Sequence, residues 1–129
     1  MRTLLQINTS LFSGEGQSSR LAAAFVDAWR ARHPEDRVVT RDLAAAPVPH
    51  LDAETYRAFG TPAAARTPAQ RTAVALSDAL IAELRAANTL VLGLPMYNFS
   101  VPSTLKAYFD HVARAGETFC YTANGPEDC

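Results

Sequence analysis

The chain has 129 residues, of which 48% are hydrophobic, and its formal net charge is −1. This length suits one domain with a core of ordinary size. A near-neutral charge without a basic block argues against nucleic acid or an anionic membrane as a partner. No apolar run is long enough to cross a bilayer or to serve as a secretory signal. The two cysteines, Cys120 and Cys129, lack metal-ligand spacing, so we expect free thiols in a reducing cytoplasm and no metal site.

The first part of the chain reads as strand, helix and strand. Residues 4–7 are an apolar run that predicts a strand, and residues 37–41 predict a second one. The helix between them takes Ser18 or Ser19 as its N-cap. Its apolar residues recur at helical spacing and predict one buried stripe that carries a core tryptophan: Leu21, Ala22, Phe25, Val26 and Trp29.

Two further helices are predicted in the middle of the chain. Residues 51–59 predict a short one. The second begins with a strong start signal, because Thr67 is a good N-cap, Pro68 occupies the first helical position and Gln70 completes a capping box. We expect this helix to end near residue 87, with Asn88 in a left-handed conformation.

A third strand and a fourth helix follow. Residues 89–94 contain almost no polar side chain, which is typical of a parallel strand that is covered on both faces. The next helix runs from about Pro102 to Gly116, and residues 119–121 predict a stub of strand or an extended loop. The order β-α-β-α-α-β-α predicts an α/β fold with a parallel sheet and helices on both faces. Three strands make only a small sheet.

A first candidate site is the loop between the first strand and the first helix. A helix N-terminus offers free N–H groups and a partial positive charge. Ser10, Gln17 and Ser18 would add side-chain donors around a phosphate. The alternative is a capped helix that is entered by a flexible loop. The glycine fingerprint of dinucleotide-binding loops and the Walker loop are both absent.

A second candidate site is Pro95-Met96-Tyr97-Asn98-Phe99, which follows the third strand. Backbone amides and Asn98 would meet the polar edge of a flat cofactor, and Tyr97 and Phe99 would stack against it or enclose it. The alternative is a strand-to-helix turn that packs its aromatic rings into the core. We interpret the scattered histidines as solvated or core-edge side chains: His33, His50 and His111.

Two motifs carry a specific resemblance. They are Pro95-Met96-Tyr97-Asn98-Phe99 and Ala113-Arg114-Ala115-Gly116, the latter followed by Thr118-Phe119. With them the chain resembles the FMN-dependent NADH azoreductases, also called NADH:quinone oxidoreductases, which have the flavodoxin-like fold. The likeness runs from Met1 to about Glu127 and includes Arg41-Asp42-Leu43-Ala44, Thr67-Pro68, Leu76-Ser77-Asp78, Tyr108-Phe109-Asp110, Tyr121-Thr122 and Asn124-Gly125-Pro126-Glu127.

The resemblance implies a cofactor, a reaction and a set of residues. NADH would pass a hydride to FMN and leave, and a quinone or an aromatic azo compound would replace it, a ping-pong sequence in which the flavin does the redox chemistry. Family members are cytoplasmic homodimers with the flavin at the subunit interface. The FMN phosphate would lie at Ser10, Gly16, Gln17 and Ser18. The isoalloxazine ring would lie against Pro95, Met96, Tyr97, Asn98 and Phe99, with Tyr121 near the mouth of the site.

The chain departs from the family pattern in three ways. Gly16 replaces a serine that relatives often carry, and Cys120 replaces a common arginine. Relatives also continue beyond the position of Cys129 with two strands, a helix and a glycine-rich loop beside the flavin. We therefore expect residues 1–129 to form the N-terminal two-thirds of one flavodoxin-like domain, with three strands, and to bind FMN more weakly than full-length relatives.

Two other functions stay open at this point. The chain would be a flavodoxin-like electron carrier or FMN-binding module without a substrate of its own, or a catalytically inert fragment. The aromatic motif at residues 95–99 and Tyr121 favour an enzyme that admits organic substrates.

Overall fold

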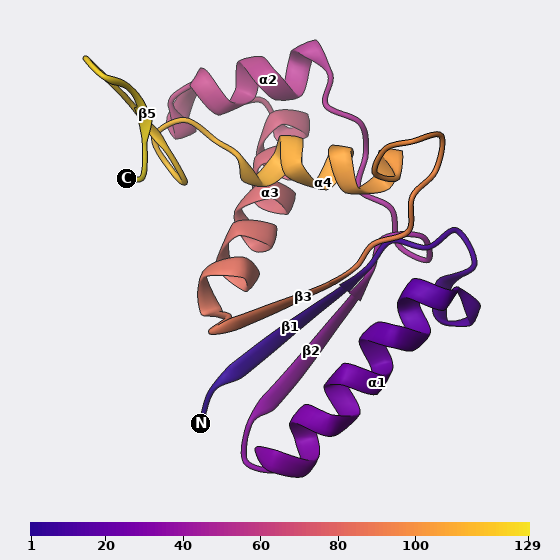
Figure 1. Cartoon of the computed structure of the whole chain (residues 1–129). Coiled ribbons are helices and arrows are strands. Elements are labelled where there is room, and N and C mark those ends of the chain that lie inside the picture. The colour runs from indigo at the N-terminus through magenta and orange to yellow at the C-terminus, as the bar shows by residue number, and fades with distance from the viewer. The chain divides into compact units, whose positions relative to one another are not determined.

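The computed structural model describes residues 1–129 and contains the predicted alternation of strands and helices (Figure 1). The strands are β1 Thr3–Asn8, β2 Arg37–Asp42, β3 Thr89–Gly93, β4 Cys120–Thr122 and β5 Gly125–Glu127. The helices are α1 Gln17–Arg32, α2 Ala53–Gly60, α3 Pro68–Ala86 and α4 Ser103–Val112, with short 3-10 turns at Ser13–Glu15 and Ala63–Ala65. None of the helices combines the length and the apolarity needed to cross a membrane.

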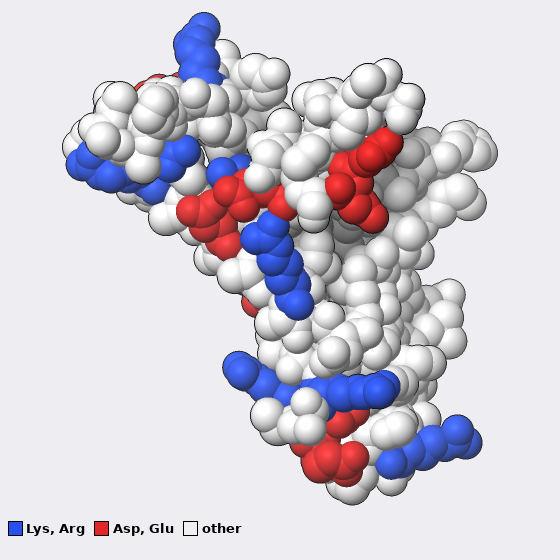
Figure 2. All heavy atoms as spheres, turned by 90° about the vertical axis from the view of Figure 1, so that its left-hand side faces the viewer, with Lys and Arg blue, Asp and Glu red and all other residues white.

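The chain divides into two compact units, which are described in turn. The sheet unit comprises Met1–Val48 and Glu83–Lys106, and the helical unit comprises Pro49–Ala82 and Ala107–Cys129. On the face drawn in Figure 2, basic and acidic side chains are interspersed and separated by wide uncharged areas.

The sheet unit is built around β1. The strand order is β2-β1-β3, and both pairings are parallel, as the sequence predicts. β1 is the central strand, and its Leu4, Leu5 and Ile7 are at most 1% exposed. Apolar side chains at successive positions of one strand point to opposite faces of the sheet, so β1 is covered on both.

β3 is only half covered, which corrects the prediction that both of its faces are buried. It is an edge strand, and the side chains of Leu90 and Leu92 are 44% and 37% exposed. Leu94, just beyond the strand, is 44% exposed. The apolar run did identify the strand correctly. The predicted burial of both faces is wrong because the residues of a strand indicate its hydrophobicity but not which elements pack on each of its faces.

α1 buries a narrower face than the sequence predicts. Its buried residues are Ser19, Ala22 and Val26, whereas Leu21 and Phe25 are 73% and 51% exposed. The small side chain of Ala22 lets the helix approach β3 closely, so that a Cβ on Gly93 would lie 3.5 Å from the Cβ of Ala22. Close backbone approach favours small residues at the contact and leaves the larger ones outside.

Trp29 is only partly buried, so the prediction that it is a core residue is wrong. Its Nε1 donates to Oδ2 of Asp36 at 3.2 Å, and its ring lies 4.4 Å from that of His33. Oδ1 of the same aspartate accepts a hydrogen bond from the backbone N–H of Arg2 at 3.1 Å. Trp29 thus fixes the end of α1 to the turn that leads into β2.

Helix starts and ends were predicted with mixed success. The capping box of α3 is confirmed, because Gln70 N donates to Thr67 Oγ1 at 3.2 Å and Thr67 N donates to Gln70 Oε1 at 3.0 Å. Asn88 does not adopt the predicted left-handed conformation. Instead it pairs with the start of β1, since its Oδ1 accepts from Thr3 N at 3.0 Å and its own N–H donates to Thr3 O at 2.8 Å.

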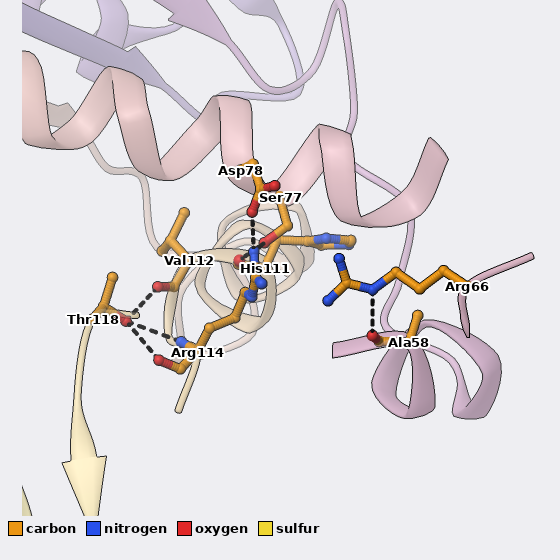
Figure 3. A network of polar contacts seen from close by, with 8 residues as sticks. All are labelled: Ala58, Arg66, Ser77, Asp78, His111, Val112, Arg114 and Thr118. Atoms are coloured by element: carbon orange, nitrogen blue, oxygen red, sulfur yellow. Dashed lines mark hydrogen bonds and ion pairs between the residues drawn. The ribbon is translucent and has the colours of Figure 1, made fainter. Parts of the chain in front are cut away.

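The core of the helical unit contains a buried polar network, shown in Figure 3. Arg114, 6% exposed, donates from Nη1 to Asp78 Oδ1 at 2.6 Å and to Ser77 Oγ at 3.1 Å. Ser77 Oγ donates to the carbonyl oxygen of His111 at 2.5 Å. The guanidinium of Arg114 also lies 4.5 Å from the ring centre of Phe59. A buried cation is tolerated only with such partners, so this network fixes the segment after α4 against α3.

His111 has a structural role in this network, consistent with a histidine at the edge of the core. It is 2% exposed, and its Nε2 lies 2.8 Å from the carbonyl oxygen of Pro49. α4 ends at Val112 and not at the predicted Gly116, because Thr118 Oγ1 donates to the carbonyl oxygen of Val112 at 2.7 Å and ends the helix there.

α2 is capped by Asp52, whose Oδ1 accepts from Thr55 N at 2.8 Å. The hydrogen bond from the backbone N–H of Thr55 stabilises the carboxylate and lowers the pKa of Asp52 below its ordinary value. The cap is therefore intact at neutral pH and is lost only when the pH falls through this lowered pKa.

The cysteines form a disulfide, which corrects the expectation of free thiols. β4 and β5 pair as an antiparallel hairpin with Tyr121 opposite Pro126. The chain reverses at this turn and brings Cys120 within 5.3 Å of Cys129, Cα to Cα, where a bridge joins them. This separation lies inside the range that a disulfide requires. The polar sequence of residues 122–129 is compatible with such a turn, but it does not show that the two cysteines meet.

We expect Arg114→Met to lower the free energy of unfolding by about 2–4 kcal/mol, because Ser77 loses a partner and the ion pair with Asp78 disappears. Arg57→Met, at an exposed position of α2, is the matched control and should change it by less than about 0.5 kcal/mol. Urea unfolding followed by circular dichroism measures both. Equal effects of the two substitutions would refute the structural role of the network.

Candidate functional site

Two loops leave the carboxyl ends of neighbouring strands in the sheet unit. Residues 9–16 follow β1, and residues 94–102 follow β3. After β1 the chain first crosses to β2 on one side and later returns to β3 on the other. Parallel sheets bind ligands outside the carboxyl ends of strands at such a change of direction. The fold therefore brings together the two segments that the sequence selected as candidate sites.

Hydrogen bonds tie the two loops to each other. Thr9 donates to the carbonyl oxygen of Gly93 twice, from its backbone N at 3.2 Å and from Oγ1 at 2.8 Å. Further out, the backbone N–H of Leu11 donates to the hydroxyl oxygen of Tyr97 at 3.1 Å. Tyr97 is one of the predicted cofactor contacts, whereas Thr9 is not predicted, because its role depends on the pairing of β1 with β3.

The N-terminus of α1 opens between these loops without a side-chain cap. Gly16 is the N-cap, and no side chain hydrogen-bonds to the first turn. The prediction that Ser18 or Ser19 caps the helix is therefore wrong, because both lie inside the first turn. Their hydroxyl oxygens are buried and have no hydrogen-bond partner in the chain. The first N–H groups of a helix also lack intrahelical partners, so this end of α1 presents several donors that an anion could satisfy.

Ser10 and Gly16 are packed directly against each other. Ser10 is 2% exposed, and its Oγ accepts a hydrogen bond from the backbone N–H of Phe12 at 3.2 Å. A Cβ added to Gly16 would lie 2.1 Å from Ser10 Oγ and 2.7 Å from Ser10 Cβ. The glycine at position 16 thus removes a possible hydroxyl donor, as the sequence indicated, and it also permits this close approach.

The segment 95–99 forms a tight, exposed turn. Tyr97 N donates to Ser100 O at 3.0 Å, and Ser100 N donates to Tyr97 O at 3.1 Å. Asn98 and Phe99, between them, have φ values of 51° and 66°. Asparagine tolerates this conformation, but a phenylalanine there is strained, and such strain concentrates at functional sites.

The aromatic side chains of this turn do not all pack into the core. Phe99 is 97% exposed and Met96 is 73% exposed, which excludes that these two side chains pack into the core. Pro95 and Tyr97 are partly buried. With Leu94 and Val101 also exposed beside it, the turn presents apolar surface at a strained position, which makes it a candidate ligand contact.

A cavity of about 390 Å³ adjoins this turn, within the size range of small-molecule sites. It is lined by Leu11, Tyr97, Asn98, Ser100, Val101, Pro102, Ser103 and Thr104. The hydroxyl of Thr104, in the first turn of α4, is buried without a partner. Leu11 and Thr104 are not among the predicted site residues, because the sequence offers no signal for them beyond their places beside the loops.

Tyr121 belongs to the helical unit and lines a different pocket. It is 76% exposed and lies beside Phe119, ring centre to ring centre 5.3 Å. Its pocket, of about 310 Å³, is also lined by Tyr56 and Phe59. No group of three or more histidine, cysteine or acidic side chains is placed to hold a metal ion.

Known proteins with similar sequences and structures are flavoenzymes by name. A family model described as flavodoxin-like fold matches residues 2–128. The FMN-dependent NADH:quinone oxidoreductase of Cellvibrio japonicus (strain Ueda107) is 56% identical over 126 residues, which are 98% of this chain and 63% of that protein. The protein of the same name from Marinomonas sp. (strain MWYL1) is 52% identical over 126 residues, 98% of this chain and 64% of that one.

Solved azoreductase structures share the fold. An FMN-dependent NADH-azoreductase from Bacillus anthracis str. Ames Ancestor in complex with FMN has a TM-score of 0.89 and 25% identity, over 100% of this chain and 63% of that one. The azoreductase from Bacillus anthracis str. Sterne has a TM-score of 0.87 and 28% identity, over 98% and 62%. The chain thus spans less than two thirds of the length of these relatives. With its sheet order and the family match over residues 2–128, the chain belongs to the flavodoxin-like fold family.

Proposed function

We propose that this chain is the FMN-binding part of an NADH:quinone oxidoreductase of the azoreductase type. The observation that carries the proposal is the uncapped N-terminus of α1, where the hydroxyls of Ser18 and Ser19 are buried without partners. An orphaned buried hydroxyl costs stability unless something satisfies it. The names of the relatives, which align with 98% of the chain, support FMN as the group that does so.

The residues at this helix end suit a phosphate. Backbone N–H groups of the first turn and the hydroxyl of Ser18 would donate to its oxygens, and the helix dipole would favour its charge. Ser10, Gly16 and Gln17 border the same place, with Gln17 exposed and free to reach outward. No lysine or arginine lies in the loop over residues 9–16, so binding would depend on neutral donors.

The second loop suits the flavin ring. Met96 and Phe99 present exposed apolar surface, and the amide of Asn98 would hydrogen-bond at the rim, with Pro95 and Tyr97 behind them. When bound, FMN would supply the hydride chemistry. The chain's own part is to orient the ring, to cover one face with Phe99 and Met96, and to place donors where charge develops.

The rest of the proposal follows from the relatives. We infer that NADH is the donor, that a quinone or an aromatic azo compound is the acceptor, and that Tyr121 lies near the mouth of the site. We further infer a cytoplasmic homodimer, in which residues 1–129 form the N-terminal two-thirds of a single flavodoxin-like domain. The unbroken family match over residues 2–128 supports one domain.

The phosphate site is tested by comparing FMN with riboflavin, which lacks the phosphate. We expect Ser18→Ala to weaken FMN about tenfold, the effect of losing one hydrogen bond to a charged group, and to leave riboflavin unchanged. Because the hydroxyl has no partner in the chain, the unliganded variant should be as stable as the wild type. Flavin fluorescence quenching and thermal melting measure these quantities.

The control for this experiment is Thr72→Ala, at an exposed position of α3. It should leave the affinity for both flavins unchanged. An equal loss of FMN and riboflavin affinity in Ser18→Ala would contradict the phosphate role, and a fall in stability without a change in affinity would make the serine structural.

The enzymatic part is tested by NADH oxidation with a soluble quinone as acceptor. We expect the FMN-loaded chain to oxidise NADH faster than the same concentration of free FMN, because the protein positions both reactants over the ring. Absorbance at the NADH band measures the rate. A yellow protein that is no faster than free FMN would indicate a flavin-binding module or carrier, and a colourless protein that takes up no FMN would indicate an inert chain.

A further inference from the structure

The aromatic pocket of the helical unit has one wall that is firmly held. Arg114 is almost fully buried, and its hydrogen bonds to Ser77 and Asp78 fix it in the network of Figure 3. Phe59 lies under the guanidinium at 4.5 Å and meets the ring of His111 edge-on at 6.4 Å. Phe59 of α2 and Arg114, which follows α4, line the pocket. Ser77 and Asp78 of α3 hold Arg114, and His111 of α4 contacts Phe59.

The opposite wall is made by Phe119 and Tyr121, which flank Cys120 at the start of the β4–β5 hairpin. Each strand of this hairpin has only three residues. Its side-chain hydrogen bonds are local, from Thr122 Oγ1 to Gly125 O at 2.8 Å and from Asn124 N to Thr122 Oγ1 at 3.1 Å. A two-stranded hairpin this short does not hold its own shape in water. Phe119 is also held to the preceding segment, because its carbonyl oxygen accepts from Gly116 N at 2.8 Å and its N–H donates to Arg114 O at 3.4 Å. The disulfide is therefore the main constraint on Tyr121 and the rest of the hairpin.

The disulfide is open to exchange chemistry. Cys129 is exposed and Cys120 is partly buried. The two are nine residues apart, and a bridge over a short loop stabilises less than one over a long loop. Exposed disulfides are the ones that small dithiols reduce readily.

A dithiol can supply both electrons that reduction of the disulfide requires. A thiolate of the dithiol attacks Sγ of Cys129, the exposed sulfur, and the bond to Cys120 breaks. Cys120 leaves as a thiolate and takes a proton. The second thiol of the reductant, as its thiolate, then displaces Cys129, which also ends as a thiol, while the dithiol becomes a disulfide.

We propose that Cys120–Cys129 is a thiol–disulfide exchange site that controls the aromatic pocket. Reduction by a dithiol frees the hairpin, and with it the part of the wall that Tyr121 forms, so that the pocket loses affinity for flat aromatic ligands. Oxidation restores both. This inference does not depend on FMN, because the pocket and the bridge belong to the helical unit alone.

Hydrogen exchange with mass spectrometry, on the complete chain with and without dithiothreitol, tests whether reduction frees the hairpin. We expect no free thiol in the oxidised, denatured protein and two after reduction. Exchange over residues 121–127 should rise at least about tenfold on reduction, while residues 107–112 of α4 remain unchanged. Reoxidation should reverse the change. Equal exchange in both redox states, or free thiols in the protein purified without reductant, would overturn the proposal.

Calorimetric titration with anthraquinone-2-sulfonate, a flat aromatic probe, tests the consequence for binding. We expect at least about a fivefold weaker affinity after reduction, and a similar loss in oxidised Tyr121→Ala. The double variant Cys120→Ser/Cys129→Ser should match the reduced protein and ignore dithiothreitol. A reductant effect that persists in the double variant, or affinity that is the same in both redox states of the wild type, would refute control by the bridge. The wild-type comparison alone decides the question if the variant does not fold.

Discussion

The parallel pairing of β1 with β3 is the constraint on which the candidate site depends. It places the ends of both strands at one edge of the sheet, and Thr9 then fastens the two following segments by donating twice to the carbonyl oxygen of Gly93. Tyr97 adds a tie to Leu11 further out. Because β1 is buried on both faces, its end is held rigidly, and so are the first residues of each loop. A rigid strand edge that carries exposed loops is the usual way in which α/β proteins present a ligand site.

Several features at this edge of the sheet reduce stability. α1 begins without a side-chain cap, a feature that typically stabilises a helix by about 1 kcal/mol. Gly16 leaves no room for one in this conformation, because a Cβ there would lie 2.1 Å from Ser10 Oγ. Two buried hydroxyls have no partner, and Phe99 holds a positive φ with its ring in solvent. The same sequence caps α2 and α3 well, with Asp52 and with the Thr67–Gln70 box. The contrast supports our proposal of a phosphate site at the start of α1.

The sequence predicted those features that local patterns determine. The three parallel strands and the capping box of α3 are confirmed, because an apolar run and a cap signal act over a few neighbouring residues. The two candidate loops follow β1 and β3 as expected, and their role in binding stays a prediction. The errors concern burial and long-range contact. Leu21 and Phe25 fit the helical spacing of a core stripe, but the approach of Ala22 to β3 turned them outward. Cys129 meets Cys120 only because the chain reverses at residues 122–125. The orphaned hydroxyls at the start of α1 also depend on what packs around them, so no pattern could reveal them.

We propose that FMN is held by the start of α1 and the turn after β3 together. Backbone amide chemical shifts, recorded by NMR on the isotope-labelled chain during an FMN titration, test this most directly. We expect shifts that saturate with one FMN per chain and that concentrate at residues 16–19 and 96–100. Riboflavin should move the second group of amides and leave the first nearly unchanged. Saturation with FMN that leaves the amide shifts of residues 16–19 unchanged would show that the start of α1 does not hold the phosphate.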